Sequence, residues 1–241
     1  MTRQRLDKKT WTLLRTDLKN SHDFSNNWAT AIKLFDERIQ DFYFKPIDKI
    51  IKPNIRKGEG FSILTLQCAL IEMFAGFRQG KIHNHRKPNK GGMKYEYKYS
   101  DDCFVIFLET EDIFENHFWI RDKTTGHKKA NPLISAKDFY AKVRCGLMHE
   151  ARTKEDWLIT AADNDNAISN VFIKLNITDK TKSINRTILQ ERLKTYFNDT
   201  YIKELAEKNE NGNKLRRLLG RKLDHLHDIP RDTSFDWWED K

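Results

Sequence analysis

The stretch that decides the fold is Ser135–Arg152, SAKDFYAKVRCGLMHEAR. Ser135 followed three residues later by Asp138 fits a capping box, in which side-chain oxygens accept hydrogen bonds from the first free N–H groups of a helix. We therefore expect a helix that begins at Ala136. Its apolar and small residues recur at i, i+4, i+7 and i+8, which predicts one buried stripe over about four turns. That stripe consists of Phe139, Val143, Gly146 and Leu147.

Arg144 and His149 lie outside this stripe, one on each side of it around the helix. On an ideal α-helix, five positions separate two residues by roughly 140° around the axis and about 7.5 Å along it. One helix therefore does not easily close both side chains on one phosphate group. The simplest complete site places two such helices around a two-fold axis, so that each chain of a homodimer contributes to a shared cleft.

The sequence Arg144-Cys-Gly-Leu-Met-His149 is an Arg-x4-His pattern late in a helix. It resembles the signature of HEPN-domain ribonucleases, which occur in prokaryotic defence, toxin and CRISPR-associated proteins. The resemblance covers residues 135–152, and two further segments, Gly58–Gly80 and Ser183–Phe197, look loosely like uncharacterised relatives of that superfamily. It implies a HEPN-like helical bundle and a metal-independent endoribonuclease that needs no cofactor, acting in the cytoplasm in phage defence or in a toxin system.

In an enzyme of this kind the RNA supplies its own nucleophile, the 2′-hydroxyl, and the products carry a 2′,3′-cyclic phosphate. The protein has to move protons and stabilise negative charge. His149 can exchange a proton near neutral pH, and Arg144 offers a planar positive fork for phosphate oxygens. Lys142 and Arg152 flank these catalytic candidates and are the expected RNA-binding residues, unless they are solvated charges. The expected partners are single-stranded RNA, tRNA or mRNA, a second copy of the chain, and an antitoxin or defence-system protein.

Two departures from the family pattern keep other interpretations open. Cys145 stands where many members have Asn or another polar residue, and Ala151 stands where one toxin branch has a modifiable Tyr. A non-catalytic HEPN-like module that binds RNA or a protein is therefore the main alternative. In a second alternative, His149 lies at the helix end because a cation is favoured there, and Arg144 is a surface charge. In a third, Cys145 and His149 form a thiol–imidazole pair at i, i+4.

Composition agrees with a folded protein that contacts polyanions. The chain has 241 residues, a formal net charge of +9, and 15 Phe, 7 Tyr and 6 Trp, which are too many aromatic residues for a disordered coil. A positive charge favours nucleic acid as a partner without proving it. Three cysteines without close pairing indicate reduced thiols in a cytoplasmic protein. We expect neither secretion nor a membrane-spanning segment.

Hydrophobic periodicity predicts a mostly α-helical single domain over residues 1–241. Besides the helix at 136–152, the expected helices cover residues 4–20, 28–51, 61–78, 103–119, 184–207 and 214–227. Short strands at Trp157–Thr160 and Val171–Leu175 predict a small β-hairpin insertion over residues 156–176. A basic, polar loop is expected at Arg121–Lys129, and a polar tail with Trp237 and Trp238 follows the last helix.

Other polar features have weaker functional meaning. Glu72 within the apolar helix is expected at the edge of the core or paired with a base, with a role near the site as the alternative. In the loop from Lys81 to Asp102, tyrosines alternate with charged residues, and the loop contains a possible short strand. It is either a solvent-exposed loop or a surface that binds single-stranded RNA. Two His-x-His pairs and the turn-rich run at 163–166 do not match metal-site spacings, so we expect no metal. The pairs are His83-Asn-His85 and His225-Leu-His227.

Overall fold

The computed structural model describes residues 4–19, 22–52, 58–86, 92–161 and 171–239. The chain forms two compact units. Unit 1 contains residues 1–42, 73–100 and 197–241, and unit 2 contains residues 43–72 and 101–196. The expectation of one domain over the whole chain stays a prediction. The run at 163–166 lies outside the described residues.

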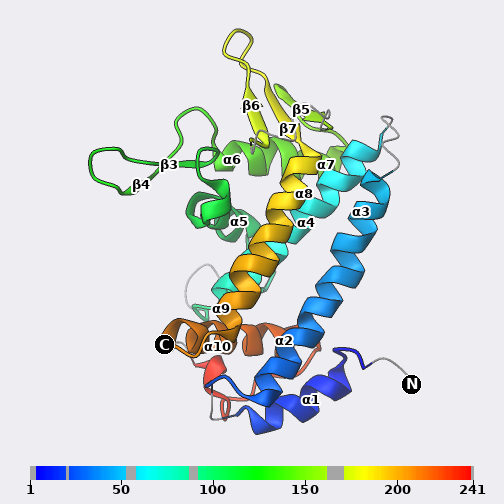
Figure 1. The fold of residues 1–241 in the computed structure, drawn as a ribbon, viewed down its shortest axis with the longest axis vertical. Helices are drawn as coiled ribbons and strands as arrows, with labels where there is room; N and C mark the ends of the chain where they lie inside the picture. Colours follow the sequence, from blue (N-terminus) through cyan, green and yellow to red (C-terminus); the bar gives the residue numbers. More distant parts are fainter. Residues whose placement is uncertain (1–3, 20–21, 53–57, 87–91, 162–170, 240–241) are drawn as a thin grey trace. The chain divides into compact units, whose positions relative to one another are not determined.

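The described residues are mostly helical, which confirms the predicted fold class at this level (Figure 1). The α-helices are α1 (Lys8–Asp17), α2 (Asn26–Ile39), α3 (Lys45–Ile51), α4 (Glu59–Gln79), α5 (Ser100–Thr110), α6 (Ala136–Asp138), α7 (Cys145–Glu150), α8 (Arg186–Thr195), α9 (Ile202–Ala206) and α10 (Glu210–Leu226). Three π-helical segments continue α2 into α3, α6 into α7 and α8 into α9; they are η1 (Gln40–Phe44), η3 (Phe139–Arg144) and η5 (Tyr196–Tyr201). Single 3₁₀ turns lie at Asp112–Phe114 and Asp236–Trp238.

The strands form three small sheets. β1 (Ile82–His83) and β2 (Glu96–Tyr97) pair in parallel, which confirms the short strand expected in the tyrosine-rich loop. β3 (Trp119–Arg121) pairs with β4 (Lys128–Ala130) in antiparallel register. The third sheet contains β5 (Trp157–Thr160), β7 (Lys182–Asn185) and β6 (Ile173–Leu175) in that spatial order.

The predicted hairpin over residues 156–176 is wrong in its pairing. Both expected strands exist, but β7 lies between them, parallel to β5 and antiparallel to β6. The hairpin that follows the motif helix is therefore β6–β7. The helix predicted over residues 184–207 begins later, at Arg186, because Asn185 ends β7 and caps α8 through its side-chain oxygen. As the central strand of this sheet, β7 is largely buried.

The predicted helix over residues 103–119 ends earlier, at Thr110, and the expected loop at Arg121–Lys129 belongs to the β3–β4 hairpin. Asp122 stabilises the turn of that hairpin by accepting hydrogen bonds from two backbone N–H groups, at Thr124 and Thr125. Gly126 completes the turn with a φ of +71°. The Phe residues that suggested a continuous helix are buried in both the helix and the segment after it.

The core of unit 1 is organised around a buried carboxylate, Asp224 on α10. Its side chain is 0% exposed and accepts hydrogen bonds from three indole N–H groups and one guanidinium. The donors are Trp11, Trp237, Trp238 and Arg15. The C-terminal segment expected to be a polar tail is therefore partly core, because its two tryptophans are buried against this acceptor.

The core of unit 2 packs the π-helical segment η3 against the third sheet and the segment after α5. Phe139 contacts Trp157 edge to face at 5.5 Å and Phe118 at 5.2 Å, and all three side chains are almost completely buried. His117 is also buried; its Nδ1 lies 2.9 Å from the Glu115 carbonyl oxygen, and its Nε2 accepts from the Phe172 N–H at 3.2 Å. These partners fix a neutral ring protonated on Nδ1.

Helix α4 is strongly apolar. Its length and composition alone would allow it to cross a membrane. The core helix of a folded protein has the same properties, and much of α4 is buried. The expectation that the chain has no membrane-spanning segment stays a prediction.

Candidate active site on the motif helix

The motif helix, α6–η3–α7, begins and packs as its sequence predicts. Ser135 is the N-cap, and its hydroxyl accepts a hydrogen bond from the Asp138 N–H at 3.3 Å. The four residues of the predicted stripe are all buried: Phe139, Val143, Gly146 and Leu147. The predicted start at Ala136 is confirmed.

The middle of the motif helix is π-helical from Phe139 to Arg144. A π-helical turn inserts an extra residue into the helical repeat, and such turns are frequent at functional sites. The α-helical spacing resumes at Cys145 and continues to Glu150. The residues between Arg144 and His149 are therefore α-helical, and the ideal separation of about 140° and about 7.5 Å stays the expectation for these two residues.

The chain reverses sharply after the motif helix and passes back over it. Ala151 has a left-handed conformation with a φ of 54°, and the Arg152 N–H then donates to the Gly146 carbonyl at 3.3 Å. A Cβ atom at Gly146 would lie only 2.5 Å from the Arg152 carbonyl oxygen. The glycine of the motif is therefore required by this close approach of the backbone.

Arg144 is held by a carboxylate from α4. Its Nε and Nη2 atoms both donate to one oxygen of Glu72, at 3.2 and 2.8 Å. The two side chains are 17% and 24% exposed. Burial opposes the charge of Arg144, but the hydrogen bonds and charge of Glu72 outweigh it and raise the pKa of Arg144 above its usual value. The guanidinium also lies 5.5 Å from the Tyr140 ring centroid.

This pairing agrees with the expectation that Glu72 is paired with a base, and sequence spacing gave no sign that the base is Arg144. Apolar residues surround Glu72 in α4, so a partner was required, but any basic residue of the chain satisfies that requirement. The two residues are 72 positions apart. Their contact follows from the packing of α4 beside the motif helix within unit 2.

His149 lies in the last turn of the motif helix and is exposed. Within the described part of the chain, its side chain makes no hydrogen bond or ion pair, and none joins it to Arg144. Met148, its neighbour, is also exposed, at 52%. The structure therefore presents the imidazole and an apolar side chain at the surface of unit 2, while Arg144 is half-buried.

The two predicted RNA-binding residues are engaged in ion pairs. Lys142 contacts Glu155 at 2.7 Å and Asp138 at 3.4 Å, and the hydrogen bond that it donates to Glu155 is the main cause of its raised pKa. Arg152 contacts Glu150 at 3.2 Å and its side chain is 66% exposed. The sequence pattern indicates Asp138 as part of the capping box, but it does not indicate Glu150 or Glu155 as partners of these cations. A phosphate would have to compete with them for both cations.

The cysteines near the motif helix have different environments. Cys68, one turn before Glu72 on α4, is buried, and burial raises the pKa of its thiol to about 12. It is therefore protonated at neutral pH and is a poor nucleophile. Cys145 is half-buried and lies one turn before the exposed His149. No hydrogen bond to an orienting group is recorded for His149 in the described residues, so the structure adds nothing to the thiol–imidazole alternative.

The histidine pairs do not assemble a metal site. Among the described residues, no group of three or more His, Cys, Asp or Glu side chains could hold a metal ion. His83, His85 and His225 line one pocket of about 600 Å³ in unit 1, whereas His227 lies at a different pocket. The nitrogen Nε2 of His227 is buried and has no hydrogen-bond partner there.

Comparisons with protein-family models, with curated proteins and with solved structures find no match to this chain.

Proposed function

We propose that this protein is a metal-independent endoribonuclease of the HEPN type, with Arg144 and His149 as its catalytic residues. The observation that carries the proposal is the division of roles along the motif helix. Arg144 is half-buried and held in one orientation by Glu72, whereas His149 is exposed at the end of the same helix. Attack of the 2′-hydroxyl on RNA requires a fixed cation and an accessible proton carrier, and the motif helix carries one of each.

In the proposed reaction, His149 takes the proton from the 2′-hydroxyl or gives a proton to the leaving 5′-oxygen. Arg144 stabilises the charge that develops on the phosphate oxygens. Glu72 bonds Nε and Nη2 of Arg144, and Nη1 is the guanidinium nitrogen outside that pair. The restraint lowers the entropy lost when the guanidinium meets the phosphate. Phage defence or a toxin system is the proposed setting, on the strength of the sequence resemblance.

The proposed site is shared between two chains. On an α-helical spacing Arg144 and His149 lie on different sides of the helix, and no hydrogen bond or ion pair joins them within the described residues. A two-fold arrangement of two motif helices brings the Arg144 of one chain to the His149 of the other. The exposed Met148, at 52%, then supplies apolar surface for contact between the chains.

The first test measures cleavage of a labelled single-stranded RNA and of total tRNA in EDTA. We expect wild-type cleavage to persist, and the variant His149→Ala to lose about 10²–10⁴-fold in rate, which is the usual contribution of a general acid or base. His127→Ala is the matched control, because His127 is an exposed histidine in the β3–β4 hairpin of the same unit. Equal cleavage by wild type and His149→Ala would refute the assignment.

The second test examines the shared site directly. Arg144→Lys keeps the charge but loses the planar fork, so it is expected to fold and to cleave poorly. When this inactive variant is mixed with inactive His149→Ala, each mixed dimer contains one site with both native residues. Recovery of about one quarter of the wild-type activity is then expected from the statistics of random dimer formation. No recovery from variants that exchange subunits would contradict the shared cleft.

A specific observation favours the second candidate function, a non-catalytic module that binds RNA or a protein. The charge of Arg144 is compensated by Glu72, and Glu150, the residue after His149, pairs with Arg152. Such pairs are also typical of purely structural helix contacts. RNA binding that is unchanged in His149→Ala, together with no cleavage by wild type, would favour this function.

A further inference from the structure

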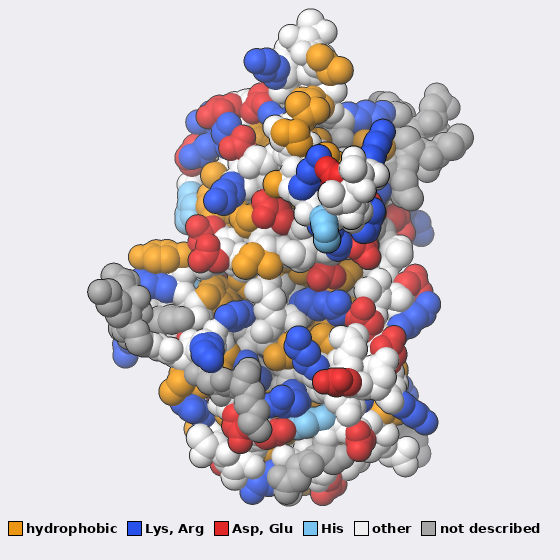
Figure 2. Space-filling model, turned by 90° about the vertical axis from the view of Figure 1, so that its left-hand side faces the viewer, with side chains coloured by type: hydrophobic (Ala, Val, Ile, Leu, Met, Phe, Trp, Pro, Cys, Tyr) orange, Lys and Arg blue, Asp and Glu red, His pale blue; other side chains and the backbone are white. Residues whose placement is uncertain are grey.

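The charged surface of the protein is mixed. Figure 2 shows Lys and Arg side chains intermingled with Asp and Glu over the face that it presents. The net charge of +9 therefore does not by itself mark a binding region. A binding site for a polyanion is instead indicated by a pocket or groove whose lining has more cationic than anionic side chains.

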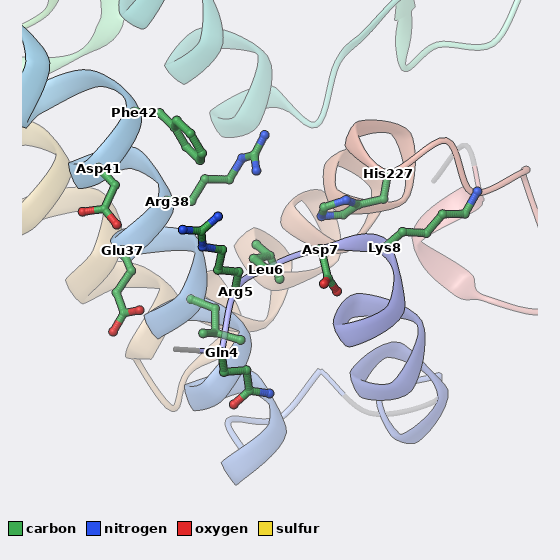
Figure 3. Close-up of a pocket in the computed structure, with 11 residues that line it drawn as sticks. Gln4, Arg5, Leu6, Asp7, Lys8, Glu37, Arg38, Asp41, Phe42 and His227 are labelled. Carbon is green, nitrogen blue, oxygen red and sulfur yellow. The ribbon is translucent and has the colours of Figure 1, made fainter. Parts of the chain in front are cut away.

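Two pockets in unit 1 differ in the balance between positive and negative side chains that line them. The pocket in Figure 3 has a volume of about 400 Å³, with Arg5 and Arg38 on one side and Asp7 and His227 on the other. Its charged side chains balance, because three cations face three carboxylates: Arg5, Lys8 and Arg38, with Asp7, Glu37 and Asp41. This composition does not favour an anion over a cation.

The second pocket, which we name the basic pocket, has a volume of about 440 Å³. It lies where the C-terminal end of α4, the segment around Lys94 and helix α10 come together within unit 1. The described residues that line it include six cations and one carboxylate, Glu239. The cations are Arg78, Lys81, Lys94, Lys214, Arg217 and Arg221. The lining thus carries an excess of five positive charges.

Ion pairs reduce this excess without removing it. Arg78 pairs with Glu204, and Arg217 contacts Asp236 at 3.3 Å. Lys214 is exposed on α10 and has no ion pair or hydrogen bond with any described side chain. These two acidic partners and Glu239 stand beside the six cations of the lining.

The floor of the pocket is rigid. Arg221 is 8% exposed and donates to the backbone carbonyls of Gly80, Trp237 and Glu239 at 3.3, 2.5 and 3.2 Å. Its guanidinium also lies 4.5 Å from the ring centroid of Tyr95, which is buried. Carbonyl oxygens orient a cation without cancelling its charge, and a buried cation gains from a nearby anion.

We propose that the basic pocket binds the phosphates of an RNA strand, as a second RNA contact in addition to the motif helix. The identity of the anion rests on the proposed function. Fixed Arg221 at the floor and exposed Lys94 and Lys214 at the rim suit a flexible phosphodiester chain, which is held mainly by charge. The loop in which tyrosines alternate with charged residues, a candidate RNA-binding surface by its sequence, contributes Lys81, Lys94 and Tyr95 to the pocket. Tyr95 is buried, so this pocket contacts phosphates and does not stack bases on that ring.

The test measures the affinity for a labelled single-stranded RNA, with His149→Ala in every protein so that the probe stays intact. The pocket variant is Lys94→Gln with Lys214→Gln, since both side chains are exposed and their loss should not affect folding. We expect affinity to fall about tenfold at moderate salt. The slope of log affinity against log salt should become shallower by about 1.4, or about 0.7 for each lost phosphate contact.

The matched control is Lys9→Gln with Lys208→Gln, two exposed lysines of unit 1 outside the basic pocket. It changes net charge equally, so equal losses in both double variants would show general attraction and overturn the proposal. An unchanged affinity in the pocket variant would also overturn it. Lys94→Arg with Lys214→Arg should keep the wild-type affinity, because it keeps both charges.

The outcomes separate this proposal from the proposed ribonuclease activity. Unchanged affinity in the pocket variant, with cleavage that depends on His149, would refute the pocket and leave the ribonuclease intact. Reduced affinity in the pocket variant, with no cleavage by the wild type, would support the pocket and refute the ribonuclease. Binding of a polyglutamate peptide but not of RNA would overturn the pocket as an RNA site.

Discussion

The buried carboxylate of Asp224 offers the sharpest test of how unit 1 is stabilised. Its Oδ2 atom accepts hydrogen bonds from Arg15, Trp237 and Trp238 at 2.8, 3.0 and 2.9 Å. Its Oδ1 atom accepts one from Trp11 at 2.8 Å. The substitution Asp224→Asn keeps the size of the side chain and replaces one acceptor oxygen with an NH₂ donor.

The magnitude follows from counting the donors. If the amide oxygen takes the place of Oδ2, the NH₂ group faces the indole N–H of Trp11, and that buried donor loses its partner at about 1–3 kcal/mol. The bonds from Arg15 and the other two indoles lose the assistance of a negative charge, which roughly halves their strength. The opposite orientation leaves three donors unpaired and is worse. We expect Asp224→Asn to lower the free energy of unfolding by about 4 kcal/mol.

Urea unfolding followed by tryptophan fluorescence measures this change, and most of the signal comes from unit 1. Four of the six tryptophans lie in that unit, and three of them donate to Asp224. With a slope of about 2 kcal/mol per molar urea, the midpoint should fall by about 2 M. The control is Asp228→Asn, because Asp228 is exposed and the charge change is the same. A midpoint within about 0.3 M of the wild type would refute the central role of Asp224.

Three further outcomes are expected. Burial, followed by the charge of Arg192, lowers the pKa of His117 to about 4, so between pH 4 and about 6.5 the unfolded state binds more protons than the folded state. The free energy of unfolding should therefore fall by about 3 kcal/mol as the pH drops from about 6.5 to 4. The variant His117→Gln, which lacks this group, is the reference for the measurement. Gly146→Ala should lower the melting temperature and reduce RNA cleavage, because its Cβ meets a backbone oxygen, at a cost of about 1–3 kcal/mol. Glu72→Gln should reduce the cleavage rate about tenfold, with little change in KM, because the guanidinium of Arg144 is no longer fixed.

Each of these outcomes can fail in a recognisable way. The same pH dependence in wild type and His117→Gln would mean that another group titrates. Full stability of Gly146→Ala would show that the turn after the motif helix moves freely. An unchanged cleavage rate in Glu72→Gln would show that the carboxylate only joins α4 to the motif helix.

Local patterns in the sequence predicted the motif helix well. The Ser135 cap and the stripe of four buried residues depend on neighbours within one or two turns, and the structure confirms both. The position of α4 and the strands β5 and β6 followed from apolar runs in the same way. These features are determined by contacts between residues close together in the chain. The catalytic roles of Arg144 and His149 stay predictions.

What the tertiary structure decided concerns residues far apart in sequence. The partner of Arg144 is Glu72, the partner of both β5 and β6 is β7, and the partner of Trp237 is Asp224. Sequence indicated that buried polar groups needed partners and that strands needed neighbours. Which groups meet depends on how the apolar faces of the helices and strands pack together. The sequence by itself therefore determined the motif helix, and only packing decided which side chains surround it.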